Sequence, residues 1–500
     1  MQNRQFLFSI FGLVVSFLVS GCMASDVGPI NRSAPQLLAF DNHFVPDHGD
    51  DGAMIIGLAF SGGGTRAAAF GYGVMRALDD TIADEYPYER SLVDNIRIIS
   101  GVSGGAVLAA YFGMKGRDDY RDFRETFLVR NAEERVRTNA LSPAVAIGVL
   151  NGGANDRSSL ARWLDDNIFH GATYSKFDWP NAPSIWISAS DIYNRVPFHF
   201  SVETFAALCS NLKDVRLADA VAASAAVPVV FKPISVASNH GACAYRQPDW
   251  LSRVMQDPEA SYRLKAYGHA LHTYRSTNVN FIKLLDGALT DNLGLTPFAM
   301  ARASAQTPYG PLSAADAVKL KTFLYIIVDA GREMEYPWVR ELQGPGLSEI
   351  LGAVTDTAIS SSVREGFDAL KLATTQWREE LIAYRCSLTA VTVMRYRGSL
   401  KGWDCRDVRF HVQRLSIQDL PVGMAARFNE VPTRFTLPTE QVDQVIAAGR
   451  VAFERNVIIQ SAIREVQSYA GVKKRVNPNL PQQDLLSSET LVSGHPYRQH

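Results

Sequence analysis

Two glycine-rich turns hold the residues with the clearest chemical potential. One of them, at 101–105, has the pattern Gly-x-Ser-x-Gly, with Ser103 at its centre and Gly101 and Gly105 at its ends. An apolar run precedes this turn and a helix-forming run follows it. A strand, a sharp turn and a helix in that order form a nucleophile elbow, which exposes a serine hydroxyl. We therefore predict that Ser103 is a nucleophile.

The other turn, at 61–66, supplies backbone amides for the negative charge that such a serine generates. The amides expected to form this oxyanion hole are those of Gly62, Gly63, Gly64 and Gly104. A dinucleotide or phosphate loop is the alternative, but Ala67 breaks the Gly-x-Gly-x-x-Gly spacing and no Gly-Lys-Ser/Thr follows. Arg66 either anchors the turn or contacts an anionic headgroup, and we expect anchoring.

A serine hydroxyl needs a base within hydrogen-bond reach. Asp286 follows the apolar run 281–285 and precedes Gly287, so we predict an acid at the end of a strand. Asp219 and Asp291 are competing acids, of which we expect Asp219 to be a surface or capping residue. A conventional triad needs a late histidine, for which His411 is the candidate.

These residues require a scaffold of strands and helices. Apolar runs at 54–60, 95–100, 184–190 and 321–328 predict buried strands, and helix-forming runs follow the first two. Strands that alternate with helices indicate a parallel sheet covered on both faces. We therefore expect a three-layer α/β fold with a mostly parallel central sheet and helical insertions.

The order Gly62-Gly63-Gly64-x-Arg66, Gly101-x-Ser103-x-Gly105 and Asp286-Gly287-Ala288 resembles the patatin-like phospholipases. The run 217–228, which ends in Pro228, resembles the helix and proline turn that precede the acid in that family. The motifs lie within 54–300, and a helical pattern at 433–449 is similar to a C-terminal element of the family. Ser61 and Ala67 depart from the family pattern, in which Asp and Gly are common.

This resemblance implies a dyad in which Ser103 is the nucleophile and Asp286 the proton acceptor, without a metal or other cofactor. The expected activity is hydrolysis of lipid carboxyl esters, of the phospholipase A or lysophospholipase kind, through an acyl-enzyme intermediate. A lipid acyltransferase with the same dyad is one alternative. A non-catalytic envelope lipoprotein that retains the fold is the other.

The first 22 residues resemble a bacterial lipoprotein signal, because a short apolar run ends in Val19-Ser20-Gly21-Cys22. We expect 1–21 to be removed, Cys22 to carry acyl chains that hold the protein on a membrane, and 22–50 to be a tether. By analogy with lipoprotein sorting, Met23 favours the outer membrane of a bacterial envelope. An ordinary signal peptide or a signal anchor with an incidental cysteine is the alternative.

Four further cysteines are candidates for disulfides in an oxidising envelope. Sequence proximity favours Cys209 with Cys243 and Cys386 with Cys405, although buried free thiols are the alternative. No Cys-x-x-Cys pattern or histidine cluster indicates a metal site.

Charge is balanced, with 50 Lys and Arg against 51 Asp and Glu, so nucleic acid is not an expected partner.

We expect a catalytic core at 51–300, interrupted by inserts at 114–180 and 236–279, and a C-terminal completion of the fold at 301–470. The first insert is expected to be largely helical. Its apolar tail, at 144–150, is expected to pack on the core, with an acyl pocket or membrane contact as alternatives. The remaining predictions are helices at 347–377 and 440–470, strands at 390–397 and 408–414, and a disordered tail at 471–500. The sequence does not indicate an oligomeric state.

Overall fold

The structure is a computed structural model that describes residues 26–36, 45–46, 48, 50–85, 89–137, 142–333 and 336–470. The expected signal sequence, Cys22 and the tail at 471–500 lie outside the described residues. Within the described part, no helix is long and apolar enough to cross a membrane.

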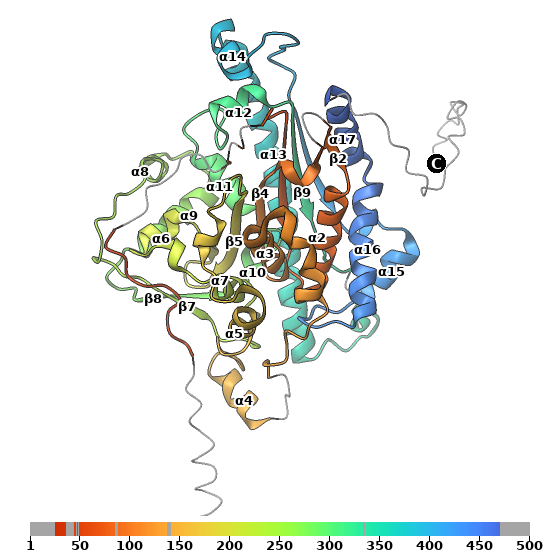
Figure 1. Ribbon diagram of the computed structural model, residues 1–500. Coiled ribbons are helices and arrows are strands. Elements are labelled where there is room, and N and C mark those ends of the chain that lie inside the picture. The colour runs from red at the N-terminus through yellow and green to blue at the C-terminus, as the bar shows by residue number, and fades with distance from the viewer. Residues whose placement is uncertain are drawn as a thin grey trace, which may run out of the picture.

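A central sheet organises the chain, with strands in the order β10-β9-β1-β4-β5-β8-β7 and β6 paired to β5 (Figure 1). The strands from β10 to β5 run parallel, whereas β6, β7 and β8 join through antiparallel pairs. Its strands are β1 Met54–Phe60, β4 Ile96–Gly101, β5 Ser184–Asp191, β6 Val196–His199, β7 Ile234–Ala237, β8 Phe281–Leu285, β9 Thr322–Val328 and β10 Arg409–Leu415. A separate ribbon pairs β2 Ile82–Asp84 with β3 Arg90–Ser91.

Helices cover both faces of this sheet, as expected for parallel strands that are buried on both faces. One core lies between the sheet and helices that include α2, α3 and α16, and a second lies between the other face and α11, α12 and α13. In Figure 1, α2 and α16 lie in front of the sheet and α13 lies behind it. The predicted three-layer α/β fold is therefore confirmed.

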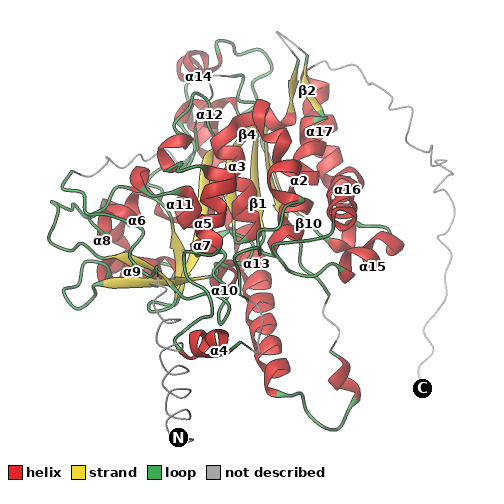
Figure 2. Ribbon diagram, turned by 60° about the horizontal axis from the view of Figure 1, so that its bottom comes forward, coloured by secondary structure: helices red, strands yellow, loops and turns green. Residues whose placement is uncertain are grey.

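The helices, shown in red in Figure 2, alternate with these strands. They are α2 Gly64–Asp79, α3 Gly104–Asp119, α4 Pro143–Leu150, α5 Leu160–Leu164, α6 Val202–Ala207, α7 Leu217–Ser224, α8 Asp249–Gln256, α9 Tyr262–Thr273, α10 Ala288–Asp291, α11 Thr296–Ser304, α12 Ala314–Lys319, α13 Leu347–Ser387, α14 Ala390–Arg397, α15 Val422–Glu430, α16 Thr439–Arg455 and α17 Val457–Ala470.

The strand expected at 390–397 is wrong, because this segment is helix α14. Its ends explain the difference. The hydroxyl of Thr389 accepts the amide of Thr392 at the start, and Gly398 closes the helix in the left-handed region at φ 72°. Such caps stabilise a short helix and outweigh a locally strand-like composition.

The insert at 114–180 is less helical than expected. Beyond the end of α3, its described part contains only short helices such as α4 and α5, with turns between them. The tail at 144–150 also departs from its prediction, since Ile147 is 59% exposed and Leu150 is 86% exposed. Helix α4 therefore directs much of its apolar surface away from the core.

The expected tether at 22–50 is wrong for its described residues, which pack on the folded body. Ile30 is buried and donates its amide to the carbonyl of Ser235, and Asn31 is hydrogen-bonded to Ser210 and Ala237. Folded structure thus begins well before β1. The polar side chains of Asn31 and Asp50 find partners on the body, which composition alone does not indicate.

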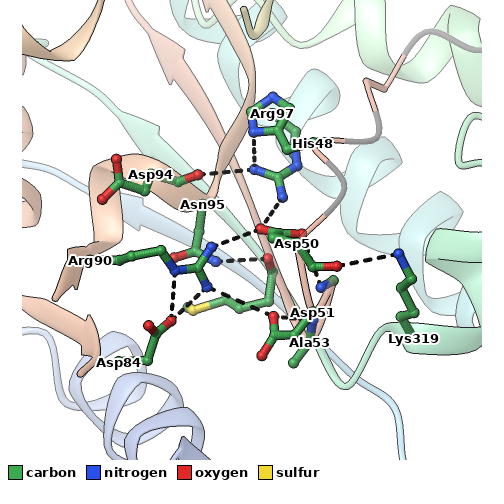
Figure 3. A network of polar contacts seen from close by, with 12 residues as sticks. His48, Asp50, Asp51, Ala53, Asp84, Arg90, Asp94, Asn95, Arg97 and Lys319 are labelled. Atoms are coloured by element: carbon green, nitrogen blue, oxygen red, sulfur yellow. Dashed lines mark hydrogen bonds and ion pairs between the residues drawn. The ribbon is translucent and has the colours of Figure 1, made fainter. Parts of the chain in front are cut away.

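Asp50 joins this segment to the sheet through two arginines, as Figure 3 shows. Its carboxylate lies 2.5 Å from the Arg97 guanidinium and 3.1 Å from that of Arg90. Arg97 belongs to β4, its side chain is fully buried, and it also contacts the Nδ1 atom of His48. Although burial raises the pKa of Asp50, the two arginine charges and their hydrogen bonds outweigh it and hold the pKa below the usual value.

We expect the Arg97→Met variant to lose about 3–5 kcal/mol of unfolding free energy, because it leaves the Asp50 carboxylate largely buried with one partner fewer. Urea unfolding at pH 7 measures the loss. Arg135→Met is the matched control, since it removes an exposed ion pair with Asp166 and is expected to cost less than about 1 kcal/mol. Equal losses in the two variants would contradict a structural role for the Asp50 contacts.

Candidate active site

Ser103 lies between the last residue of β4, Gly101, and the first residue of α3, Gly104. Its backbone has φ 53° and ψ −119°, a conformation that residues with a Cβ rarely adopt. The Ser103 amide donates to the Ser224 hydroxyl at 2.8 Å, and this hydrogen bond holds the turn in place. A strained turn that persists because its surroundings fix it is typical of a nucleophile elbow.

Asp286 directly follows β8, and the Ser103 hydroxyl donates to its Oδ2 atom at 3.0 Å. The other carboxyl oxygen, Oδ1, accepts the amide of Ala288 at 2.9 Å. Both side chains are buried. Burial raises the pKa of Asp286 to about 6, and the hydrogen bonds from Ala288 and Ser103 offset part of that rise. The structure thus brings the two predicted residues into direct contact.

The direction of β8 decides this contact. β8 runs antiparallel to β5 and pairs only with the last two residues of that strand, Ser190 and Asp191. The chain therefore leaves β8 on the side of the sheet where the carboxyl end of β4 lies, rather than on the side of its amino end. In addition, the Ser190 hydroxyl donates to the Asp286 carbonyl at 2.7 Å, and the Asp286 amide donates to Ala226.

The two glycine turns touch each other. A Cβ atom on Gly104 would lie 1.9 Å from the carbonyl oxygen of Gly64, so only glycine permits this approach. Among the described residues, the amides of Gly63, Gly64 and Gly104 have no hydrogen-bond acceptor. They lie at or next to the N-termini of α2 and α3, where helix dipoles favour negative charge.

Gly62 differs from its three predicted companions. Its amide already donates to the carbonyl of Asn292 at 3.0 Å, so in this structure it is not a free donor. A Cβ atom on Gly62 would approach the side-chain oxygen of Asn292 at 2.6 Å and the Cβ of Ser103 at 3.5 Å. The structure therefore gives Gly62 a steric place beside the nucleophile.

Arg66 anchors the first turn. Its guanidinium donates to the carbonyls of Ala330 at 3.0 Å and Val431 at 2.7 Å, and the side chain is buried. Burial lowers the pKa of Arg66 to about 9, with a contribution from Arg332 and an opposing one from Asp329. The amide of Thr65 meanwhile donates to the Arg434 carbonyl, so the C-terminal part of the chain helps to fix the loop.

Sequence reasoning missed the serines that support the dyad. Ser224 accepts the Ser103 amide and donates its own hydroxyl to the carbonyl of Ser188 at 2.6 Å. Ser224 belongs to the 217–228 run that the family resemblance covers. The sequence therefore marks this segment as important, but it does not indicate the hydrogen bond between Ser224 and Ser103. No sequence pattern singled out Ser190.

The two competing acids, Asp219 and Asp291, and the candidate His411 make contacts elsewhere in the fold. Asp219 is buried rather than on the surface, and its carboxylate pairs with Arg157 at 3.1 Å. Asp291 accepts the amides of Leu295 and Thr296 at the start of α11. His411 lies on β10, with β9 and β1 between it and β4. None of the three is hydrogen-bonded to Ser103 in the described part of the chain.

The four cysteines form the pairs Cys209–Cys243 and Cys386–Cys405. The first bond joins the 236–279 insert to the end of α6, and the second links the end of α13 to the turn before β10. Within the described residues, no cluster of three or more His, Cys, Asp and Glu side chains could hold a metal ion.

A strained serine turn and a buried acid on a three-layer α/β fold are typical of acyl hydrolases. Residues 58–299 match the model of the patatin-like phospholipase family. This part of the chain is therefore similar to the patatin-like phospholipases. No curated protein matches the chain.

Among solved structures, human GIVD cytosolic phospholipase A2 matches at 13% identity with a TM-score of 0.38. The match covers 84% of this chain and 63% of the human chain. The same human enzyme in complex with a methyl gamma-linolenyl fluorophosphonate inhibitor and terbium chloride matches at 14% identity, with a TM-score of 0.34 and 60% of its chain covered. The chain thus spans less than two thirds of the length of these structures.

Proposed function

We propose that this protein cleaves carboxyl esters of phospholipids or lysophospholipids, with Ser103 as the nucleophile and Asp286 as the general base. The 3.0 Å hydrogen bond from the Ser103 hydroxyl to Asp286 Oδ2 carries the proposal. A carboxylate with a pKa of about 6 is ionised at neutral pH and still basic enough to accept a proton. The buried dyad is also shielded from bulk water, which strengthens its electrostatic interactions.

The reaction has two steps. Asp286 takes the Ser103 proton while Oγ attacks the ester carbonyl, and the resulting tetrahedral oxyanion collapses to an acyl-enzyme. The departing alkoxide takes that proton from Asp286 and leaves as an alcohol. Asp286 then removes a proton from water, hydroxide attacks the acyl carbon, and Ser103 regains a proton as the fatty acid departs. The free amides of Gly63, Gly64 and Gly104 are the proposed donors to both oxyanions.

Exposed apolar side chains, some of them on a loop that contacts Asp286, fit a lipid substrate. The loop after Ala226, whose carbonyl accepts the Asp286 amide, continues to Val229 and Val230, which accept the amides of Ala154 and Asn155 just beyond α4. Helix α4 and the start of α13 project at the same end of the molecule (Figure 2). The exposed apolar residues there are Ile147, Val149, Leu150, Val227, Val229, Leu347, Ile350 and Val354. We propose that this surface lies on the lipid.

The double substitution Ile147→Glu and Leu150→Glu is expected to lower hydrolysis of phospholipid in vesicles by about tenfold or more, because each side chain loses about 1–2 kcal/mol of apolar burial. Hydrolysis of a short, soluble nitrophenyl ester should change less than about twofold. Val391→Glu on α14, at the other end of the molecule in Figure 1, is the exposed control. Unchanged vesicle hydrolysis in the double variant would refute the proposed surface.

We further propose that acyl chains on Cys22 anchor the protein to a bacterial membrane, the outer membrane on the sequence pattern. Replacing Cys22 with serine in the full chain is expected to move the protein from the membrane fraction to the soluble fraction. The same variant should lose incorporation of an alkynyl palmitate label. Retention of label in Cys22→Ser would show that another residue carries the acyl chain.

One experiment tests the function itself. Purified protein is incubated with a panel of phospholipids and lysophospholipids, with and without an added alcohol acceptor, and the products are identified by mass spectrometry. Free fatty acid as the main product supports hydrolysis, whereas transfer to the alcohol in preference to water indicates an acyltransferase. Absence of acyl release from every lipid would favour a non-catalytic binding protein.

A further inference from the structure

One hollow in the described part of the molecule does not contain Ser103 or Asp286. It has about 490 Å³ of empty space, part of it open to solvent, and lies between β5, α6, α9 and α11. These helices gather at the β8 and β7 side of the sheet (Figure 1). Its lining includes four aromatic side chains, and the polar side chains that line it are His199, Ser201, Glu203 and Ser304.

His199 leaves a buried polar atom without a partner. The side chain is 5% exposed, and its Nδ1 atom lies 3.0 Å from the hydroxyl of Ser188. Its Nε2 atom has no hydrogen-bond partner in the described part of the chain. Burial lowers the pKa of His199 to about 3, so the ring is neutral. When Nδ1–H donates to Ser188, Nε2 is an unused acceptor, which is costly unless a ligand supplies a donor.

Glu203 adds a carboxyl group that lacks a counter-charge. One of its oxygens accepts the indole N–H of Trp250 at 2.6 Å, and no ion pair joins it to a described Lys or Arg. Burial raises the pKa of Glu203 to about 7, against the smaller opposing effect of the Trp250 hydrogen bond. A carboxyl group in an aromatic hollow without a cation is unfavourable for the protein alone.

Aromatic rings lie next to His199 and Glu203 in this hollow. Trp250 stacks parallel to Tyr267 with ring centroids 6.2 Å apart, and Tyr267 lies 5.5 Å from the His199 ring. Trp186 and Phe200 form further parts of the wall. Aromatic faces attract organic cations, and Trp does so most strongly.

We infer that this hollow is a binding site for a primary ammonium group attached to an apolar body. The ammonium would donate one N–H to Glu203 and another to Nε2 of His199, while the aromatic walls hold the apolar part. An alcohol offers a single O–H and no charge, so it can satisfy only one of the two acceptors. The site is separate from Ser103 and Asp286, which do not line it.

Isothermal titration of the full chain at pH 8 with benzylamine and with benzyl alcohol tests the inference. We expect benzylamine to bind at least about tenfold more tightly than benzyl alcohol. Glu203→Gln should remove this preference and change the affinity for the alcohol less than about twofold. Glu259→Gln, at an exposed position in the 236–279 insert that also contains Trp250, should leave both affinities unchanged.

Two further variants keep the result decisive. Ala301→Phe fills the hollow and should abolish binding of both probes without touching Glu203 or His199. Ser103→Ala should leave benzylamine binding unchanged, so a loss there would place the ligand at the dyad instead. Equal affinity for amine and alcohol, an unaltered preference in Glu203→Gln, or no binding of either probe would overturn the inference.

Discussion

The Ser103→Ala variant should lose ester hydrolysis by about 10⁴-fold or more in kcat, because no other hydroxyl can form the acyl-enzyme. Covalent labelling by a fluorophosphonate probe should disappear at the same time. The change removes one oxygen atom, and the turn remains held by the Ser103 backbone amide on Ser224. We therefore expect the thermal unfolding midpoint to stay close to that of the wild type.

The matched control is Ser399→Ala, at an exposed position beyond α14. It should keep full activity and full labelling. Labelling that persists in Ser103→Ala, located to another residue by peptide mass spectrometry, would show that the nucleophile lies elsewhere.

The Asp286→Asn variant is expected to lower kcat by about 10³- to 10⁴-fold, since the amide cannot accept the Ser103 proton. Asp291→Asn is a demanding control, because Asp291 is also buried and lies five residues further along the same segment. That substitution weakens the start of α11 and should reduce stability, yet change kcat by less than about tenfold. Equal losses of kcat in the two variants would mean that Asp286 acts through the fold rather than as the base.

The pH dependence of activity and of stability tests the role of Asp286 independently. Because the base must be ionised, kcat/KM of the wild type should rise as pH increases through about 6 and level off above it. The folded-state pKa lies above the ordinary value of 3.8, so unfolding free energy falls as pH rises from about 4 to about 6. Asp286→Asn avoids that loss and should be more stable than the wild type at pH 8, by on the order of 3 kcal/mol. A less stable Asn variant at pH 8 would contradict a buried carboxylate.

Local features of the sequence were sufficient for much of the scaffold. The strands β1 and β9 follow from largely apolar runs, and β4 and β5 follow from apolar runs that polar residues such as Arg97 and Ser188 interrupt, because a strand buried on both faces is mostly apolar. Short segments were less predictable. Residues 390–397 form a helix because of capping contacts at Thr389 and Gly398, and Asn31 and Asp50 pack on the body through polar contacts to distant residues.

The sequence by itself was sufficient to single out the candidate site residues, because the Ser103 turn and the glycine loop depend on neighbouring residues and their backbone conformations. It did not decide their arrangement. The meeting of Ser103 and Asp286, 183 positions apart, requires β8 to run antiparallel to the end of β5. Likewise, the engagement of the Gly62 amide by Asn292 follows from tertiary packing. Such contacts depend on strand register and on the removal of both partners from water, and these are properties of the folded chain.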